Sequence, residues 1–341
     1  MKKVFLVVAA AATVLVLGSF AQANITIDTV TVGDSGNAGE LSGAGNYPPS
    51  RICGSVDYTY NIGRYEVTAG QYTAFLNAVA RTDTYGLYNA NMWSSSSGCK
   101  IQRAGASGSY TYSVASPLAN KPVNCVSYWD ACRFTNWLHN GQLDGAQNAF
   151  TTERGAYTLD GYNGSDGSTI QRNATWRWAV TSEDEWYKAA YYKGGGPNAG
   201  YWLYPTQSNS VPSNDITSPD AGNNACFNQN GFTMGGPDYR TIVGEFENSE
   251  SAYGTFDQGG NFWEWNEAVI YQDAYPCRGM RGGSFYSPDS ALRASHRDYE
   301  FLGFEGTDVG FRVSQSVPEP SPLLALLGGL AALLGLRRRR A

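Results

Sequence analysis

The sequence predicts one α+β domain with little regular secondary structure and many loops. Only a few segments show the amphipathic period of a helix, and long stretches rich in Gly, Asn and Ser separate them. Gly occurs 40 times, and Phe, Trp and Tyr together make up 13% of the 341 residues. Such a composition is typical of a chain with many turns that is held together by aromatic packing. Neither a βαβ series nor a repeat of fixed period is visible, so the pattern favours α+β over the α/β and repeat classes.

The first elements lie at the start of the body of the chain. Residues 24–58 are rich in Gly, Ser and Asn, and their segment ITIDTVTVG predicts an edge strand and a loop. We expect this stretch to lead into the main domain at residues 59–316. A short strand is predicted at Arg64–Val67, and it meets Thr68, a residue type that caps helices. The helix after this cap is expected to bury one face, formed by Tyr72, Phe75, Leu76 and Val79.

Two further helices follow the same scheme. Ser127 precedes a helix predicted at Trp129–Leu138, and Asp130 lies where an acid completes a capping box. Ser182 precedes the other helix, and the acids Glu183–Glu185 occupy its first turn, where the helix dipole favours negative charge. Gly194 is expected to end the helix.

The N-terminus carries the pattern of an export signal. Lys2 and Lys3 precede the apolar run Val4–Leu17, and a small-residue site ends at Ala23. This order predicts a secretory signal peptide over residues 1–23. A membrane anchor is the alternative, but the apolar run is short for a bilayer.

The C-terminus, residues 317–341, carries a second signal with three parts. The motif Val317–Pro320 is followed by the apolar segment Leu323–Leu336 and by Arg337–Arg340. Together these parts resemble the PEP-CTERM sorting signal of Gram-negative bacteria, which an exosortase processes. The resemblance implies export through the inner membrane, transient anchoring by residues 323–336 as a short transmembrane helix, and a final place at the cell surface or outside the cell. A plain tail anchor is the alternative.

The net charge and the cysteines of the body exclude some functions. Between the two signals lie 18 basic and 29 acidic residues, and this acidic balance argues against a nucleic-acid partner. An exported chain with six cysteines is expected to form disulfides, for which 15 pairings are possible. A zinc site is not expected, because the only histidines are His139 and His296 and there is no CxxC pair.

Six segments in order resemble the formylglycine-generating enzyme family, also called the sulfatase-modifying-factor domain. They extend from Gly63 to Ser314 and read GRYEVTAGQYTAFLNAVA, KPVNCVSYWDACRFTNWL, TSEDEWYKAAYYKGG, GGNFWEWNE, RGGSF and DVGFRVS. The resemblance implies a loop-rich elaboration of the C-type-lectin-like α+β fold with little regular secondary structure. The fold class reached from the residues alone is the same.

The resemblance also implies what the loop Arg281–Asp298, RGGSFYSPDSALRASHRD, corresponds to. In family members that make formylglycine, two cysteines five residues apart in this loop bind copper and oxidise a cysteine of a client sulfatase. The corresponding places here are Ser287 and Leu292. Neither side chain suits copper(I), which prefers soft sulfur ligands, so copper and formylglycine generation are not expected. Cys277 is a weak substitute, and half of a disulfide is its favoured role.

The surroundings of that site give the pocket candidates Trp263, Ser284, Ser287 and Arg293. The resemblance assigns Trp263 and Ser284 to the pocket wall. Positive charge nearby could come from Arg281, Arg293, Arg297 and Arg312. The alternative is that the aromatic residues are core residues and that the arginines pair with acids.

The same family resemblance implies calcium as a cofactor. The segment DQGGNFWE offers the side chains of Asp257 and Glu264 and the carbonyls of Gly260 and Phe262, and Ca²⁺ takes six to eight such oxygens. A weaker second set consists of Asn224, the Ala225 carbonyl and Asp238. In the alternative interpretation Asp257 caps a turn and Glu264 meets an arginine.

Two functional hypotheses follow. The first is an exported, calcium-stabilised binding or structural module that no longer makes formylglycine, with a peptide or a glycan such as exopolysaccharide as its ligand. The alternative is an oxidoreductase of the same family that uses a different metal or redox centre. The first is favoured, because the chain lacks the extra histidine-rich helical domain of such relatives.

Overall fold

The computed structural model describes residues 24–43 and 49–318, in which two four-stranded sheets lie at the centre. The strand order is β1-β4-β12-β7 in one sheet and β10-β9-β8-β11 in the other. The first sheet contains β1 (Thr29–Val32), β4 (Tyr60–Gly63), β7 (Trp178–Val180) and β12 (Val313–Ser316). The second contains β8 (Trp263–Gln272), β9 (Tyr275–Arg281), β10 (Asp298–Phe301) and β11 (Val309–Phe311).

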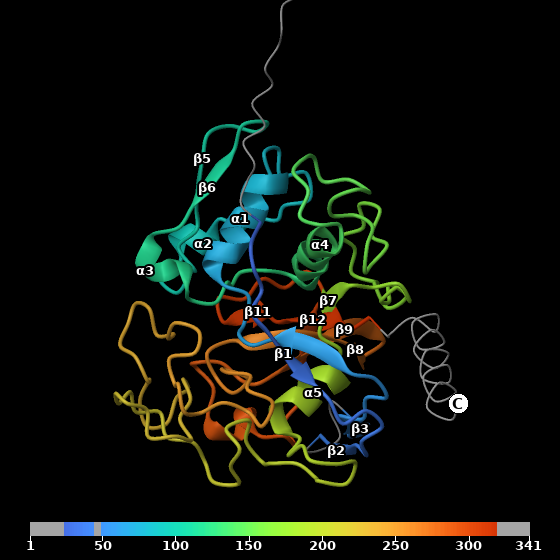
Figure 1. Ribbon diagram of the computed structural model, residues 1–341. Coiled ribbons are helices and arrows are strands. Elements are labelled where there is room, and N and C mark those ends of the chain that lie inside the picture. Colours follow the sequence, from blue (N-terminus) through green and yellow to red (C-terminus); the bar gives the residue numbers. More distant parts are fainter. Residues whose placement is uncertain (1–23, 44–48, 319–341) are drawn as a thin grey trace, which may run out of the picture.

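Helices cover the sheets on two sides. Figure 1 shows α1 (Ala69–Val79) and α4 (Tyr128–His139) on one side of the central strands and α5 (Glu183–Tyr191) on the other. The remaining elements are short: β2 (Glu40–Ser42), β3 (Arg51–Cys53), α2 (Asn91–Ser94), β5 (Gln102–Ala104), β6 (Thr111–Ser113), α3 (Ser116–Ala119) and the 3-10 turn η1 (Asp289–Leu292). Long loops connect them, so the predicted loop-rich α+β class is confirmed.

The three predicted helices form where their caps indicate. Thr68, Ser127 and Ser182 each accept a hydrogen bond from the backbone N–H three residues later, and each helix begins with a complete capping box. The predicted face of α1 is buried. It meets α4 through Phe75 and Phe134, whose ring centroids lie 5.3 Å apart. Phe134 lies equally close to Phe311 of β11, so aromatic contacts join both helices to the sheet.

The predicted strand at Arg64–Val67 is wrong in its position, since β4 ends at Gly63. Beyond Gly63 the side chains serve other contacts. Tyr65 stacks on Phe256 with the ring centroids 5.5 Å apart. The Glu66 carboxylate accepts hydrogen bonds from the Phe262 N–H and the Asn261 amide. The segment ITIDTVTVG does form an edge strand, β1, which pairs antiparallel with β4.

The predicted disulfides are also wrong, because all six cysteines are free and buried. Cys99, Cys125 and Cys132 belong to the main core cluster, while Cys53 packs with α5 and Cys226 packs with Phe262 and Phe285. Burial raises the pKa of the Cys53 thiol to about 11 and that of Cys226 to about 12. The cysteines therefore act as small apolar core residues.

The two export signals lie almost entirely outside the described residues. The signal peptide and the apolar segment Leu323–Leu336 are not described, and of the C-terminal motif only Val317 and Pro318 are. Between residues 24 and 318, as far as the chain is described, no helix is long and apolar enough to cross a membrane.

The two central sheets are joined by a buried ion pair. The chain passes from β11 to β12 at Arg312, and the guanidinium of this residue contacts the carboxylate of Glu264 in β8. The Nε–Oε2 distance is 3.0 Å and the Nη2–Oε1 distance is 2.8 Å, and both side chains are fully buried. Arg312 also donates to the carbonyls of Gly63 and Phe256. The pair therefore fixes how one sheet meets the other.

Removal of one charge from this pair is expected to be costly. Glu264→Gln keeps an oxygen that can accept from the Trp186 indole, but it removes the carboxylate that contacts the buried Arg312 directly. We expect a loss of about 3–5 kcal/mol in the free energy of unfolding, measured by denaturant unfolding. Arg154→Gln, in the exposed pair with Asp160, is the control and should behave like the wild type. A Glu264→Gln protein as stable as the control would contradict this role of the pair.

Candidate functional site

The loop between β9 and β10 is shaped by its glycine pair. Gly282 and Gly283 have φ angles of +98° and +75°, which favour glycine. A Cβ on Gly283 would lie 2.9 Å from Leu292 Cδ1 and 3.3 Å from Ser287 Cβ. The side chains of Ser287 and Leu292 thus approach the same point. The turn brings together the two positions at which the family resemblance implies cysteines.

Ser284 and Ser287 belong to a small hydrogen-bond network. The Ser284 N–H donates to Ser287 Oγ (2.9 Å), and the two hydroxyl oxygens lie 3.3 Å apart. The Ser284 hydroxyl also donates to the Asp308 carboxylate at 3.0 Å. Burial raises the pKa of Asp308, and the Ser284 hydrogen bond offsets part of this rise. Both serine side chains are buried, and their hydroxyl oxygens are poor ligands for copper(I).

Trp263 lies beside this network. It pairs with Val309 across β8 and β11, and its N–H donates to the Asp308 carbonyl at 2.9 Å. The ring of His296 lies 5.6 Å from the Trp263 ring, centroid to centroid. Burial lowers the pKa of His296, which favours the neutral imidazole. Three of the predicted pocket residues, Trp263, Ser284 and Ser287, are therefore brought together.

The fourth pocket candidate, Arg293, lies elsewhere. Its Nε donates to the Tyr204 hydroxyl at 2.8 Å, and its Nη2 lies 3.8 Å from the Asp289 carboxylate. The other arginines of the region also have acidic partners. Arg281 and Arg297 contact Glu183 at 2.8 and 2.6 Å, and Arg312 contacts Glu264.

Leu292 and Cys277 support no metal centre. Leu292 is fully buried in the main core cluster. Cys277 is buried in β9 opposite Phe301 and Ile270. Within the described part of the chain, no group of three or more His, Cys, Asp or Glu residues could hold a metal ion.

The residues expected to bind calcium have other partners. Asp257 accepts a hydrogen bond from the Gly244 N–H at 2.6 Å. Both Glu264 oxygens bind Arg312, and Oε2 also accepts from the Trp186 indole at 2.7 Å. A carboxylate engaged in this way does not fit the role of charged calcium ligand. Asp257 keeps one carboxylate oxygen without a hydrogen bond from the described residues, so it fits that role better.

The second predicted set is only partly brought together. Asn224 and Ala225 are neighbours and line a small cavity with Asp257. The Asn224 side-chain amide donates to the Asp220 carboxylate. Asp238 instead contacts Lys121 at 3.0 Å and Arg240 at 3.7 Å. The arrangement therefore unites Asn224 and Ala225 with Asp257, while Asp238 pairs with two cations.

Sequence reasoning missed several residues of this region. Asp308 lies in the motif DVGFRVS and Glu66 lies in GRYEVT. The sequence analysis predicted no role for either residue. Burial raises the pKa of Glu66 well above its ordinary value, and the charges of Asp257 and Glu264 raise it further. The signal available in the sequence was an acidic residue inside each of these two motifs.

An aromatic cluster covers the outside of the loop. Tyr286 and Phe232 are 47% and 39% exposed. Their rings lie 5.5 Å apart, and Tyr239 lies 4.8 Å from Phe232 and stacks on the buried Phe285. We call Phe232, Tyr239 and Tyr286 the aromatic cluster. It offers an apolar surface beside the Ser284–Ser287 network.

Comparisons with solved structures give distant likenesses. The crystal structure of CarF is 20% identical over 86% of this chain and 99% of that one, with a TM-score of 0.49. PvdO from Pseudomonas aeruginosa is 20% identical over 85% and 94%, with a TM-score of 0.48. Variable protein 1 of Treponema denticola is 17% identical over 84% and 94%, with a TM-score of 0.46. The comparison with curated proteins returned no match.

The family profile is decisive. The profile of the sulfatase-modifying factor enzyme 1-like domain matches residues 21–317, which contain all six motifs as well as the loop with Ser284 and Ser287. This match extends over most of the chain. The chain therefore belongs to the sulfatase-modifying factor (formylglycine-generating enzyme-like) family.

Proposed function

We propose that this protein is a non-redox binding module of its family, which recognises a peptide or a glycan and does not make formylglycine. The observation that carries the proposal is the chemistry of the loop. Ser287 and Leu292 approach each other around Gly283, yet they offer a hydroxyl that is hydrogen-bonded to Ser284 and an alkyl group buried in the core. A pair of this kind has no thiolate with which to bind copper(I).

The aromatic cluster supports ligand recognition at the same place. Exposed rings held against one another present apolar area at little entropic cost, and such rings are favoured at recognition surfaces. Ser284 and Ser287 are buried, and the half-buried Asp308 carboxylate, which accepts from the Ser284 hydroxyl, supplies a polar group. A sugar ring or an aromatic peptide side chain suits this combination.

The place of action in this proposal follows from the two ends of the chain. The signal peptide and the PEP-CTERM-like tail would take the protein through the inner membrane of a Gram-negative bacterium, where an exosortase would process the tail. The protein would then act at the cell surface or outside the cell, with exopolysaccharide as a candidate partner. The acidic body makes nucleic acid an unsuitable ligand.

Calcium is proposed as a stabilising ion with a ligand set centred on Asp257. Burial raises the pKa of Asp257 to about 6, and the negative charges of Glu264 and Glu245 add to the effect. Glu66, Asp257 and Glu264 lie near one another and near the cation Arg312, so among these four groups negative charge is in excess. A bound dication would compensate for this excess of negative charge. Because Glu264 is held by Arg312, the family ligand set is not fully available.

The proposal that Ser287 and Leu292 do not bind copper can be tested by replacing both residues with cysteine. We expect the wild-type protein to retain little copper after loading with copper(I) and desalting. The variant Ser287→Cys with Leu292→Cys should retain about one ion per chain, because its thiolates would lie around Gly283. Competition with bicinchoninate measures the affinity, and Ser287→Cys alone is the matched control.

Two outcomes would contradict the proposal that this loop occupies the copper position but does not bind copper. Stoichiometric copper or iron in the wild-type protein would support the oxidoreductase alternative. A folded double variant without copper(I) affinity would contradict the assignment of the loop positions.

The calcium proposal has a definite pH signature. A carboxyl with a raised pKa in the folded state binds protons there that the unfolded chain has lost, so stability falls as the pH rises from about 4 to 6. Without calcium, we expect the melting temperature to be lower at pH 7 than at pH 5, and calcium should restore a few degrees at pH 7.

Asp257→Asn should reduce this pH dependence and abolish the response to calcium. Asp273→Asn is the control, since Asp273 is exposed and lies in the β8–β9 turn. Identical melting of the wild-type protein in calcium and in chelator at pH 7 would end the calcium proposal.

Recognition by the aromatic cluster is testable with glycan and peptide arrays. Tyr286→Ala should weaken the strongest ligand found by roughly tenfold or more, because it removes an exposed ring at the centre of the surface. Tyr275→Ala is the control, since Tyr275 is 65% exposed at the β8–β9 turn. An absence of ligands in both arrays, or equal losses in the two variants, would count against the proposal.

A further inference from the structure

The chain between β10 and β11, residues 302–308, lies against the segment that leads into α4. We call these residues the β10–β11 loop. The Cys125 N–H donates to the Gly306 carbonyl at 2.9 Å. The Tyr128 N–H, in the first turn of α4, donates to the Leu302 carbonyl at 3.1 Å. Backbone hydrogen bonds near both ends of the loop therefore hold it on the start of α4.

The last residue of the β10–β11 loop belongs to the candidate functional site. The Asp308 carboxylate accepts from the Ser284 hydroxyl at 3.0 Å, and the Asp308 carbonyl accepts from the Trp263 N–H at 2.9 Å. The loop thus connects the start of α4 to the Ser284–Ser287 network. A change in how the loop is held would reach that network through Asp308.

In the middle of the loop, two carboxyl groups meet. A hydrogen bond joins the side chain of Glu305 to that of Asp130, which lies in the first turn of α4. Asp130 is buried, and its Oδ2 accepts from the N–H and the hydroxyl of Ser127. The Oε2 of Glu305 accepts from the Asn89 amide at 2.6 Å. An ionised carboxylate only accepts hydrogen bonds, so Glu305 and Asp130 can bind each other only while one of them carries a proton.

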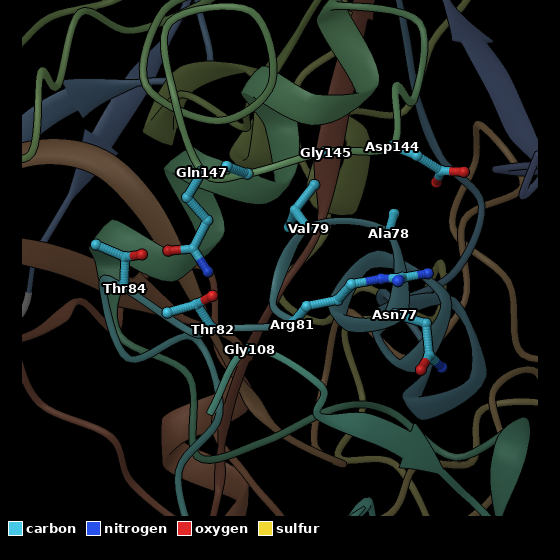
Figure 2. A pocket seen from close by; sticks show the side chains of 11 residues that line it. Asn77, Ala78, Val79, Arg81, Thr82, Thr84, Gly108, Asp144, Gly145 and Gln147 are labelled. Carbon is cyan, nitrogen blue, oxygen red and sulfur yellow. The ribbon is translucent and has the colours of Figure 1, made fainter. Parts of the chain in front are cut away.

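A third acid, Asp83, adds negative charge next to this pair. Its charge raises the pKa of both carboxyl groups. Asp83 pairs with Arg103 at 3.3 Å. Burial raises the pKa of Asp83 itself, and a hydrogen bond from the Gln147 amide offsets part of this rise. Figure 2 shows the Gln147 side chain beside Thr82 and Thr84, the two neighbours of Asp83 in the chain.

The other groups that face the pair do not replace its proton with a positive charge. Arg133 lowers the pKa of Asp130, but the Arg133 guanidinium binds the Glu153 carboxylate at 2.8 Å. Burial raises the pKa of Tyr72 and of Cys125, so both stay neutral. The proton that the two carboxyl groups share is therefore what allows them to stay in contact.

The shared proton links the contact to pH. Burial and the negative charge of Asp130 raise the pKa of Glu305 from 4.5 to about 8. A Glu305 side chain that is released into water loses its proton near the lower value. Between about pH 5 and 8 the closed loop therefore binds one proton more than the open loop, and a rise in pH favours opening.

We propose that the β10–β11 loop is a pH-sensitive latch. Glu305 and Asp130 hold the loop closed on α4 while they share a proton, and loss of the proton releases it. Release withdraws Asp308 from Ser284 and Trp263, so the latch controls the order of the Ser284–Ser287 network. The latch does not depend on which ligand the protein binds.

Glu305→Gln tests the latch, because glutamine has the shape and the hydrogen bonds of a protonated glutamate at every pH. Its oxygen can accept from Asn89, and its amide can donate to the Asp130 carboxylate. Amide hydrogen exchange of the full-length protein at the Cys125 and Tyr128 N–H groups reports how often the loop opens. At pH 5 the two proteins should exchange at similar rates. At pH 8 the wild type should exchange faster than the variant by roughly tenfold or more.

Two controls separate the latch from a general change in stability. Glu247→Gln makes the same substitution at an exposed carboxylate that accepts from the Asp220 N–H, and it should follow the wild type at both pH values. The Trp186 N–H, which donates to the Ser182 carbonyl in α5, should show no such difference between the wild type and Glu305→Gln.

A ratio of wild-type to Glu305→Gln exchange that stays constant from pH 5 to pH 8 would overturn the latch. An equal rise at Trp186 would also overturn it, because the whole molecule would then be responding. The wild-type protein alone gives a further test that needs no variant. Its exchange at Tyr128, corrected for the intrinsic effect of pH, should rise relative to Trp186 between pH 5 and pH 8, and a constant ratio would contradict the proposal.

Discussion

The contact between Glu264 and Arg312 is the constraint on which the centre of the molecule depends. Two charges buried together lose their hydration, and the loss is offset only if their hydrogen bonds are complete. Here the guanidinium reaches Glu264 and the carbonyls of Gly63 and Phe256, while the carboxylate also accepts from Trp186. The pair therefore specifies one mutual arrangement of β4, β8 and α5. Because both Glu264 oxygens accept hydrogen bonds from Arg312 or Trp186, this carboxylate is poorly placed to bind another ligand.

A second buried acid positions the loop that follows β9. Glu183 is the first residue of α5, and its carboxylate forms ion pairs with Arg51, Arg281 and Arg297. Burial alone would raise the pKa of Glu183, but the arginines lower it to about 2. The loop between Arg281 and Arg297 is thus held at both of its ends by one carboxylate. These contacts fix the path of the loop from outside its interior, where Ser287 and Leu292 lie.

The helices were predictable from local chemistry, while the contacts of the site were not. Thr68, Ser127 and Ser182 signal their helices because capping depends on residues three apart. The strand at β4 was displaced in the prediction, since Tyr65 and Glu66 have strand-like neighbours in the sequence but contact Phe256 and Phe262 in space. Family resemblance placed Trp263, Ser284 and Ser287 together. It could not show that Asp308 joins them, because that contact spans the chain from β9 to β11.

The position of β12 sets an order on folding. This strand is the last described element, yet it lies in the interior of its sheet, between β4 and β7. Its neighbours can meet it only after almost the whole chain is available, and such long-range pairing is slow to form. Until then Tyr60, Ile62 and Ala179, which are buried in the finished sheet, have no complete partner. In a polypeptide that emerges from its N-terminus first, β1 and β4 can pair early, but β4 and β7 stay unconnected until β12 arrives between them.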